Sequence, residues 1–221
     1  MKKRITVQSD TKKNNFNVKN KKSKIISFLK FVQEWNKIQE WKFPRHHKEI
    51  VRWLTDMYKE KNRKGLLLAF RGSGKSSIVA LFAAWILHRD NDVRILILSA
   101  DERLAKKMSN NIKKIIMTHP ITVNLKPTKK DNWSSTSFTI NREKTLRDAS
   151  VMAVGISGNI TGSRADVIIC DDVEVPKNCN TFIKRENLRE KLSELEFILT
   201  PGGLILYVGT PHTHRTIYKT M

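Results

Sequence analysis

The stretch AFRGSGKSS, residues 69–77, decides the fold of this chain. It follows the apolar run GLLL and precedes the apolar run IVALFAAWIL, so two glycines, a lysine and two serines separate two buried segments. Glycines allow backbone N–H groups to approach an anion closely, and the N-terminus of a following helix adds partial positive charge. The stretch therefore predicts a phosphate-binding loop between a strand and a helix.

The loop fits the Walker A pattern G-x-x-x-x-G-K-[S/T] except at its first position, where Ala69 replaces the glycine. In this pattern Lys75 reaches the β- and γ-phosphates of ATP, and the Ser76 hydroxyl ligates Mg²⁺. We therefore expect ATP and Mg²⁺ as cofactors. The residues expected to bind the nucleotide are Arg71, Gly72, Ser73, Gly74, Lys75, Ser76 and Ser77.

A second stretch, ADVIICDDVEVP at 165–176, supplies the carboxylates that such a site needs. Four apolar residues predict a buried strand, and Asp171 and Asp172 follow at its carboxyl end, the edge at which open α/β sheets bind ligands. Asp171 is expected to hold Mg²⁺ through water. Asp172, or Glu174 two residues later, would polarise the attacking water as general base, because residues 172 and 174 of a strand point to the same face.

A third stretch, LILYVGTPHTH at 204–214, predicts a buried strand that ends at a hydroxyl. We expect Thr210 to lie beside the γ-phosphate, where it can sense the loss of that group. His212 and His214 have a spacing that could bind a metal, but no further His, Cys or acid is placed to complete a set. We expect these two histidines to be surface residues.

The hydrophobic pattern predicts two helices between Ile25 and about Glu60, with Pro44 in FPR (43–45) starting the second. After Gly65 strands and helices alternate. The strands are expected at 66–70, 94–99, 137–140, 151–154, 167–170 and 204–208, and the helices at 75–88, 102–118 and 181–199. Short apolar strands without alternation favour a mostly parallel sheet that is covered on both faces.

These elements predict a three-layer α/β fold of the P-loop NTPase type. A strand and its helix at 94–118 separate the two motifs, which is typical of the additional-strand (RecA/ASCE-like) class. We expect three parts: a disordered basic arm at 1–24, an N-terminal helical lead at 25–62 and the ATPase core at 63–221. Trp35, Trp41 and Trp53 are expected to pack the helical lead onto the sheet.

The charge balance predicts a polyanionic partner. The chain of 221 residues has 42 Lys and Arg against 21 Asp and Glu, a net charge of +21. Residues 1–24 hold nine of these cations and one acid, so the rest of the chain keeps about +13. A surplus of this size is typical of contact with nucleic acid. The two cysteines form no CxxC pair, and no apolar run reaches about 18 residues, so we expect a soluble protein that is not secreted.

Four ordered segments resemble the large terminase subunit of tailed bacteriophages, in particular the T7-like type called DNA maturase B: FRGSGKS, ILILSADERLAKKM, ITGSRADVIICDDVEVP and LILYVGTPHTHRTIYK. The resemblance covers roughly residues 44–221. It implies an ATPase motor that pumps double-stranded DNA into a preformed capsid in the cytoplasm of an infected host cell. The implied partners are the small terminase subunit, the portal protein and further copies of the chain in a ring.

The resemblance also assigns residues by position. Lys75 and Ser76 would bind the phosphates and the metal, Asp171 would be the Walker B aspartate, and Thr210 would lie in the motif that couples hydrolysis to motion. Asp172 stands where the family usually has a catalytic glutamate, which keeps Glu174 as a rival. Large terminases also carry a C-terminal nuclease domain, which we expect to be absent from this chain, so nuclease activity is not expected.

Two further pairs of residues are candidates for contacts with ATP. Arg164 could act as an arginine finger supplied by a neighbouring subunit, or it could simply pair with Asp166 or Asp171; Arg71 in the loop is its competitor. His46 and His47 lie where related motors contact adenine, but two adjacent histidines are also common on a solvated surface.

Two other functions fit the same motifs. A helicase-like nucleic-acid ATPase would share them, although it is expected to have a second RecA-like domain. A non-catalytic assembly protein that binds DNA and nucleotide would fit the expected loss of the nuclease, but the intact set of Lys75, Ser76, Asp171 and Asp172 argues against decay of the site.

Overall fold

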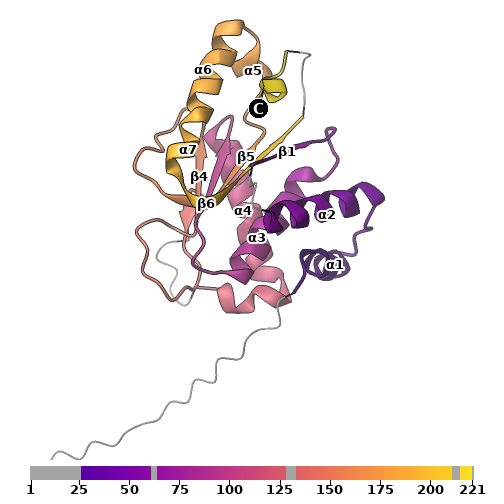
Figure 1. The fold of residues 1–221 in the computed structure, drawn as a ribbon. Coiled ribbons are helices and arrows are strands. Elements are labelled where there is room, and N and C mark those ends of the chain that lie inside the picture. The colour runs from indigo at the N-terminus through magenta and orange to yellow at the C-terminus, as the bar shows by residue number, and fades with distance from the viewer. Residues whose placement is uncertain (1–25, 61–63, 128–132, 211–214, 221) are drawn as a thin grey trace, which may run out of the picture.

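The computed structural model describes residues 26–60, 64–127, 133–210 and 215–220, and its centre is a six-stranded sheet (Figure 1). The order across the sheet is β1-β6-β5-β2-β4-β3, and all neighbours pair in parallel except β3 and β4. The predicted, mostly parallel sheet is confirmed. The strands are β1 (Lys64–Leu68), β2 (Ile95–Ser99), β3 (Ser137–Phe138), β4 (Val151–Gly155), β5 (Ala165–Asp171) and β6 (Leu199–Gly209).

The position of β6 fixes the class of the fold. This strand lies between β1, which leads into the phosphate loop, and β5, which ends at Asp171. One additional strand between these two is the mark of the additional-strand class of P-loop ATPases, so the predicted class is confirmed. The strand on which that prediction relied, at 94–99, is not the additional one, because β2 lies on the other side of β5. Because β1, β6 and β5 are parallel, their carboxyl ends meet at one edge of the sheet.

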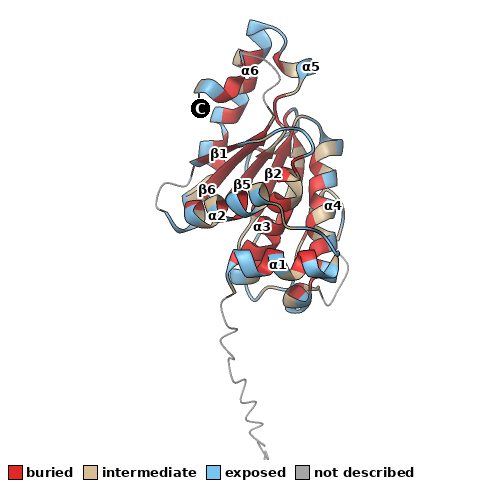
Figure 2. Cartoon of the chain, turned by 90° about the vertical axis from the view of Figure 1, so that its right-hand side faces the viewer, coloured by how far each residue is buried: buried red, intermediate tan, exposed pale blue. Residues whose placement is uncertain are grey.

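Helices cover both faces of the sheet, which gives the predicted three layers (Figure 2). Side chains of β2 alternate between the two cores: Ile95 and Ile97 face α3 and α4, whereas Leu96 and Leu98 face α6 and α7. All five residues of β2 are buried, which explains its continuous apolar sequence. The helices are α1 (Phe28–Ile38), α2 (Arg45–Lys59), α3 (Lys75–Arg89), α4 (Glu102–Thr118), α5 (Pro176–Cys179), α6 (Phe182–Ser193) and α7 (Leu195–Ile198), and the 3-10 segments are η1 (Pro120–Leu125) and η2 (Ile217–Thr220).

Helix α3 is buried on every side, because α1 and α2 pack over the face that it turns away from the sheet. The helical lead therefore packs chiefly on α3 and shares one hydrophobic core with the sheet. Trp35 is buried there, and Trp53 lies against Gly65 of β1. The expectation for Trp41 is wrong: this residue follows the end of α1, and 55% of its surface is exposed.

The predicted helix at 181–199 differs most from the structure. Helix α6 ends at Ser193, a separate turn α7 covers Leu195–Ile198, and β6 begins at Leu199. The apolar residues at 195–199 fit a helical period and a strand equally well, so the boundary could not be assigned from periodicity. As a result β6 is longer than the predicted strand at 204–208.

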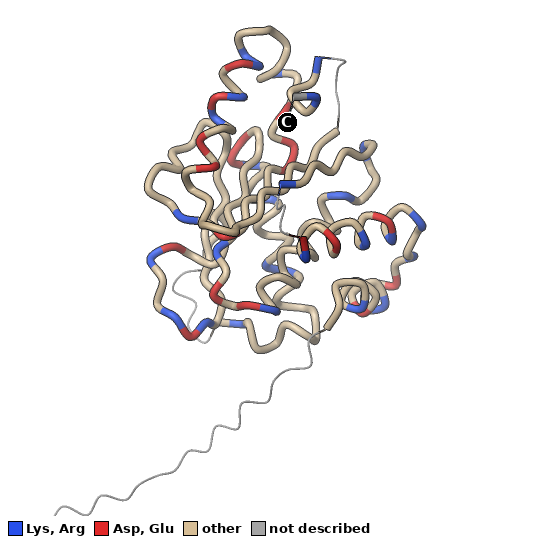
Figure 3. The backbone as a smooth tube through the Cα atoms, in the orientation of Figure 1, with Lys and Arg blue, Asp and Glu red and all other residues tan. Residues whose placement is uncertain are grey.

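Among the residues that the structure describes, the charged ones lie at the ends of the strands and in the helices and loops (Figure 3). Strand β5 carries an aspartate near each end, Asp166 and Asp171, with apolar side chains between them. Residues 1–24, His212 and His214 lie outside the described residues. Within the part of the chain that the structure describes, none of the helices has the length and apolar character needed to cross a bilayer.

Candidate nucleotide-binding site

The predicted phosphate loop connects β1 to α3 in the expected way. Two of its residues have a left-handed backbone, Gly72 with φ of 83° and Gly74 with φ of 76°, and Gly74 is the N-cap of α3. A side chain at Gly74 would also collide with His47, since an added Cβ would lie 2.7 Å from its Nε2. Both glycines are thus required by the backbone, and the loop leads the chain into the N-terminus of a 15-residue helix.

Two histidines of α2 hold the backbone of this loop. Nε2 of His46 and Nε2 of His47 lie 3.2 Å and 2.8 Å from the carbonyl oxygen of Ser73. Burial lowers the pKa of His47, the charge of His46 acts in the same direction, and the hydrogen bond to Ser73 opposes both. Both rings are half-buried rather than fully solvated, and they connect the helical lead to the loop. Contact with adenine stays a prediction.

Lys75, Thr210 and Asp172 converge above the carboxyl edge of the sheet. The Lys75 ammonium is buried, donates a hydrogen bond of 2.8 Å to Thr210 Oγ1 and lies 3.9 Å from Asp172 Oδ1. Thr210 Oγ1 in turn donates to the carbonyl of Ala69 at 3.2 Å. Each of the three residues belongs to a different motif, so the fold brings the loop, the acidic stretch and the hydroxyl motif to one point.

Ser76 and Asp171 lie side by side, as the metal site requires. Ser76 Oγ donates to Asp171 Oδ1 at 3.1 Å. Burial raises the pKa of Asp171 to about 6, the charge of Asp172 adds to this rise, and Ser76 and Lys75 oppose it. A hydroxyl and a buried carboxylate are oxygen ligands that suit Mg²⁺, which usually takes its remaining ligands from water and phosphates. The nearby Oδ1 of Asp172 is buried and has no hydrogen-bond partner among the described residues, although Lys75 Nζ lies 3.9 Å away, and this unused acceptor adds to the fit. Ser77, the last residue of the predicted set, is partly exposed in the first turn of α3.

Asp172 and Glu174 do not share a strand face, so the geometric expectation that treated them alike is wrong. Strand β5 ends at Asp171, and Asp172 has a left-handed backbone with φ of 46°. Its side chain turns toward Lys75 and stays partly exposed. Glu174 is buried and accepts hydrogen bonds from Thr216 Oγ1 at 3.0 Å and from the backbone N–H of Ile217 at 2.7 Å. Which of the two activates water stays a prediction.

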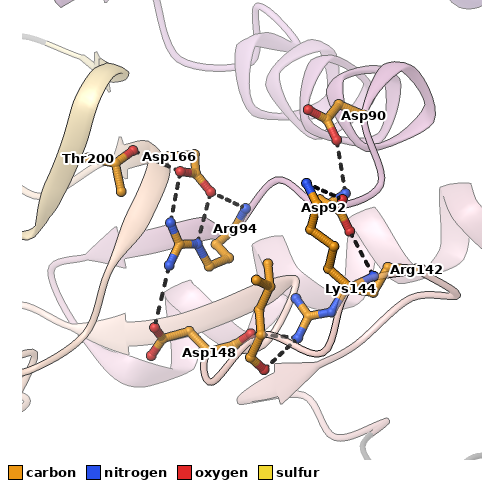
Figure 4. A network of polar contacts seen from close by, with 9 residues as sticks. Asp90, Asp92, Arg94, Arg142, Lys144, Asp148, Asp166 and Thr200 are labelled. Carbon is orange, nitrogen blue, oxygen red and sulfur yellow. Dashed lines mark hydrogen bonds and ion pairs between the residues drawn. The ribbon is translucent and has the colours of Figure 1, made fainter.

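Arg164 and Arg71 lie far apart. Arg71 is exposed in the phosphate loop. Arg164 precedes β5 at the opposite edge of the sheet, about 20 Å from the nucleotide site at 3.3 Å per residue, and donates to the carbonyl of Phe197 at 2.7 Å. It does not pair with Asp166, which binds Arg94 instead (Figure 4). Arg164 is thus distant from the nucleotide site of its own chain, and its role as an arginine finger stays a prediction.

Sequence reasoning missed three contributors: Thr216, Tyr218 and the role of the histidines as supports of the loop. Thr216 and Tyr218 stand more than 40 residues from Glu174. Both lie in the fourth segment that resembles large terminases, but nothing local in that segment marks them as partners of Glu174. The sequence marks the histidine pair at 46–47 as a candidate, but the partner of both rings is a backbone carbonyl, which a sequence does not reveal.

The chain matches one family model and one curated relative. The model ResIII, described as "Type III restriction enzyme, res subunit", matches residues 40–174. The large terminase subunit of Enterobacteria phage T3 is 43% identical over 162 residues, which are 72% of this chain and 28% of that protein. The resemblance to large terminases noted from the motifs is thereby confirmed, and the chain spans little more than a quarter of its relative.

Solved structures share the fold. The large terminase of bacteriophage HK97 has a TM-score of 0.55 and 11% identity over 80% of this chain and 35% of its own. Saccharomyces cerevisiae Dbp5, solved with ADP, has a TM-score of 0.50 and 10% identity over 83% of this chain and 46% of its own. The chain thus has the fold of an ATPase-type P-loop domain, is similar to a phage terminase large subunit, and belongs to the ResIII family.

Proposed function

We propose that this chain is the ATPase motor domain of a viral DNA-packaging terminase, which hydrolyses ATP to move double-stranded DNA into a procapsid. One observation carries the proposal: Lys75 Nζ lies 2.8 Å from Thr210 Oγ1 and 3.9 Å from Asp172 Oδ1. A γ-phosphate at this point would contact all three motifs at once. Packaging as a whole is taken from the T3 relative, of which the chain spans 28%.

The residues divide the chemistry of hydrolysis between them. The backbone N–H groups of the phosphate loop and Lys75 hold the phosphates, and Ser76 with Asp171 would hold Mg²⁺, which supplies positive charge to the phosphate oxygens when bound. Asp172 accepts a proton from the attacking water, since its carboxylate faces the same point and is partly open to solvent. Glu174 is the alternative base, but two donors already occupy one of its oxygens.

Thr210 couples the presence or absence of the γ-phosphate to the end of β6. Its hydroxyl accepts from Lys75 and donates to the Ala69 carbonyl, so it links the phosphate loop to the end of β6. When phosphate leaves, Lys75 changes partner, and the change reaches β6 through this one side chain. An arginine finger would stabilise the negative charge of the γ-phosphate. It would be Arg164 of a neighbouring copy or Arg71 of the phosphate loop.

A cleft beside the site, lined by three lysines and by the acids Asp101 and Glu102, offers a path for DNA. Its volume is about 790 Å³, and it lies between the loops that follow β2 and β4 on one side and α5 with α6 on the other. Lys184, Leu188 and Lys191 follow one stripe of α6 toward the cleft, and Lys177 of α5 joins them. Lysines bind DNA phosphates without regard to sequence, as a packaging motor requires.

The resemblance to large terminases supports a proposal about the assembly and its location. We propose that the chain works as a homo-oligomeric ring on a portal protein, with a small terminase subunit, in the cytoplasm of an infected host cell. The net charge of +21 suits a protein that surrounds DNA.

A helicase-like ATPase is the alternative, because the ResIII match covers residues 40–174. Two assays separate the candidates. Displacement of a third strand from a triplex reports movement along intact double-stranded DNA, whereas release of one strand from a forked duplex reports unwinding. A motor domain displaces the third strand with ATP and leaves the fork intact; fork opening would identify a helicase. ATP binding without turnover in either assay would identify a non-catalytic protein.

A further inference from the structure

Glu174 is the most deeply buried carboxylate among the described residues. Its relative exposure is 1%, and one oxygen, Oε2, accepts from both Thr216 Oγ1 and the Ile217 N–H. The other oxygen, Oε1, is buried and has no hydrogen-bond partner among the described residues. A buried carboxylate with half of its acceptors unused is costly, so its location calls for a role other than stability.

The segment that Glu174 holds also touches the hydroxyl motif. Tyr218 Oη accepts a hydrogen bond of 3.4 Å from the Glu174 N–H, and the ring packs on Gly209, the last residue of β6. A Cβ added to Gly209 would lie 2.6 Å from Tyr218 Oη, so only glycine leaves room for the ring. Residues 216–218 are therefore wedged between Glu174 and Gly209.

The two residues that enclose the 216–218 segment, Glu174 and Gly209, are each close in sequence to a residue that faces the γ-phosphate position. Glu174 is two residues from Asp172, and Gly209 directly precedes Thr210. The Asp172 N–H donates to the carbonyl of Val208 at 2.8 Å, which ties the two turns together behind the site. A shift of the turn at Asp172 or of the turn at Gly209 must therefore move residues 216–218 or break the hydrogen bonds that hold them.

We infer that Glu174 is a positioning residue, which with Thr216, Ile217 and Tyr218 forms a latch that sets the spacing of Asp172 and Thr210 and passes the nucleotide state to residues 215–220. The inference rests on the proposed ATP hydrolysis. It assigns Glu174 a task that does not require its carboxylate to reach the attacking water. The incomplete hydrogen bonding of Oε1 leaves the latch able to rearrange.

The direct test is hydrogen exchange of the Ile217 amide, measured on the whole chain with and without Mg²⁺ and a non-hydrolysable ATP analogue. This N–H is fully buried and bonds to Glu174, so its exchange reports the latch itself. We expect nucleotide to slow its exchange about tenfold or more in the wild type. If the analogue is shown to bind and the Ile217 amide still exchanges at the same rate with and without it, the inference is overturned.

Variants separate the latch from a general base. Thr216→Val and Glu174→Val should each lower kcat by about ten- to a hundredfold through misplacement of the reacting groups, with KM for ATP within about twofold. Glu174→Gln keeps an oxygen that can accept from Thr216 and Ile217, so it should lower kcat less than Glu174→Val does. The double variant should be no slower than the slower single variant, because both break one device. If Thr216→Val kept wild-type turnover while Glu174→Gln lost it, Glu174 would be the base and the inference would fail.

The matched control lies at the opposite edge of the sheet. Thr200 Oγ1 donates to Asp166 Oδ1 at 2.7 Å, so Thr200→Val removes the same kind of hydroxyl–carboxylate bond. It should lower the melting temperature but leave kcat and the nucleotide response of Ile217 unchanged. If Thr200→Val slowed turnover as much as Thr216→Val, loss of stability would explain both.

Failure of the latch can be told from failure of the proposed function. A chain that hydrolyses ATP and moves DNA while Ile217 ignores nucleotide has the function without the latch. A chain that binds no ATP has neither.

Discussion

Strand β5 carries an aspartate near each end, and the two side chains have opposite surroundings. Asp166, at the amino edge, accepts from Arg94 Nε at 2.9 Å, from the second guanidinium nitrogen at 3.0 Å and from Thr200 at 2.7 Å (Figure 4). Asp171, at the carboxyl edge, accepts one hydrogen bond among the described residues, from Ser76. The same residue type is thus fully paired at one end and left short of partners at the other.

The pKa values follow this difference. Burial alone would raise the pKa of Asp166, but the hydrogen bonds from Arg94 and Thr200 outweigh it and hold the pKa below its usual range. At Asp171 burial dominates and raises the pKa to about 6. At the amino edge the protein itself supplies the hydrogen-bond partners of the aspartate. At the carboxyl edge it leaves the aspartate with free acceptors, as expected where a ligand binds.

The largest effect is expected for Lys75→Ala. Lys75 is the buried cation at the ligand edge, and its loss removes the charge partner of the β- and γ-phosphates. We expect ATPase activity to fall about 10³-fold or more, with the melting temperature unchanged within experimental error. A rate within a few-fold of wild type, measured by phosphate release, would contradict the role of this edge.

Asp172→Asn should come next. A general base that is replaced by its amide loses turnover by about 10²–10⁴-fold while ATP still binds. Turnover and ATP affinity should be measured separately, by phosphate release and by calorimetry. If affinity for Mg·ATP fell instead, Asp172 would be a metal ligand rather than the base.

The cleft lysines extend the comparison to DNA. Replacing Lys177, Lys184 and Lys191 by glutamine should make the slope of log affinity against log salt shallower by about 3, roughly one contact per lysine. The matched control is the glutamine triple of Lys59, Lys64 and Lys144, which are exposed and near the amino edge. Filter binding of a double-stranded fragment gives both slopes, and an equal loss in the two triples would mean that charge alone, not the cleft, binds DNA.

At the amino edge, Asp166→Asn should affect stability alone. It breaks charge-assisted hydrogen bonds to Arg94, so we expect unfolding to become easier by about 2 kcal/mol, or about 4–8 °C in melting temperature. The ATPase rate per folded molecule should not change. Asp171→Asn is the matched variant on the same strand, and it should show the reverse: lost turnover with no fall in melting temperature.

The smallest effect is expected in the pH dependence of the melting-temperature difference between wild type and Asp166→Asn. Because the folded-state pKa of Asp166 is lowered, its stabilising contribution is fully present above the ordinary value of 3.8 and is lost as pH falls through the lowered one. The gap in melting temperature between wild type and Asp166→Asn should therefore be constant near neutral pH and shrink as the pH falls below 3.8. A gap that widened in acid would show that Asp166 is not the group involved.

The sequence predicted the carboxyl edge far better than the amino edge. The phosphate loop, α4 at Glu102–Thr118 and the place of Asp171 at a strand end follow from local patterns, because glycine spacing and apolar periodicity act over a few residues. Arg94 and Asp166 stand 72 residues apart, and nothing local marks them as partners.

The misplaced details have equally physical causes. The turn at Asp172 depends on a left-handed backbone that non-glycine residues rarely adopt, so the assumption that residues 172 and 174 point to the same face, as on a strand, is wrong. The start of β6 at Leu199 and the exposure of Trp41 depend on which segments pack nearby, and packing is not visible in a helical period.

The burial of α3 has a consequence for anyone who wishes to shorten this protein. Phe82 and Trp85 are covered by Phe28 of α1 and Tyr58 of α2, with ring centroids 5.2 to 6.1 Å apart. A fragment that began at β1 would keep every proposed catalytic side chain. It would also expose the aromatic rings of Phe82 and Trp85 to water, which favours aggregation. The smallest soluble piece of the ATPase must therefore start at or before Ser27, the N-cap of α1.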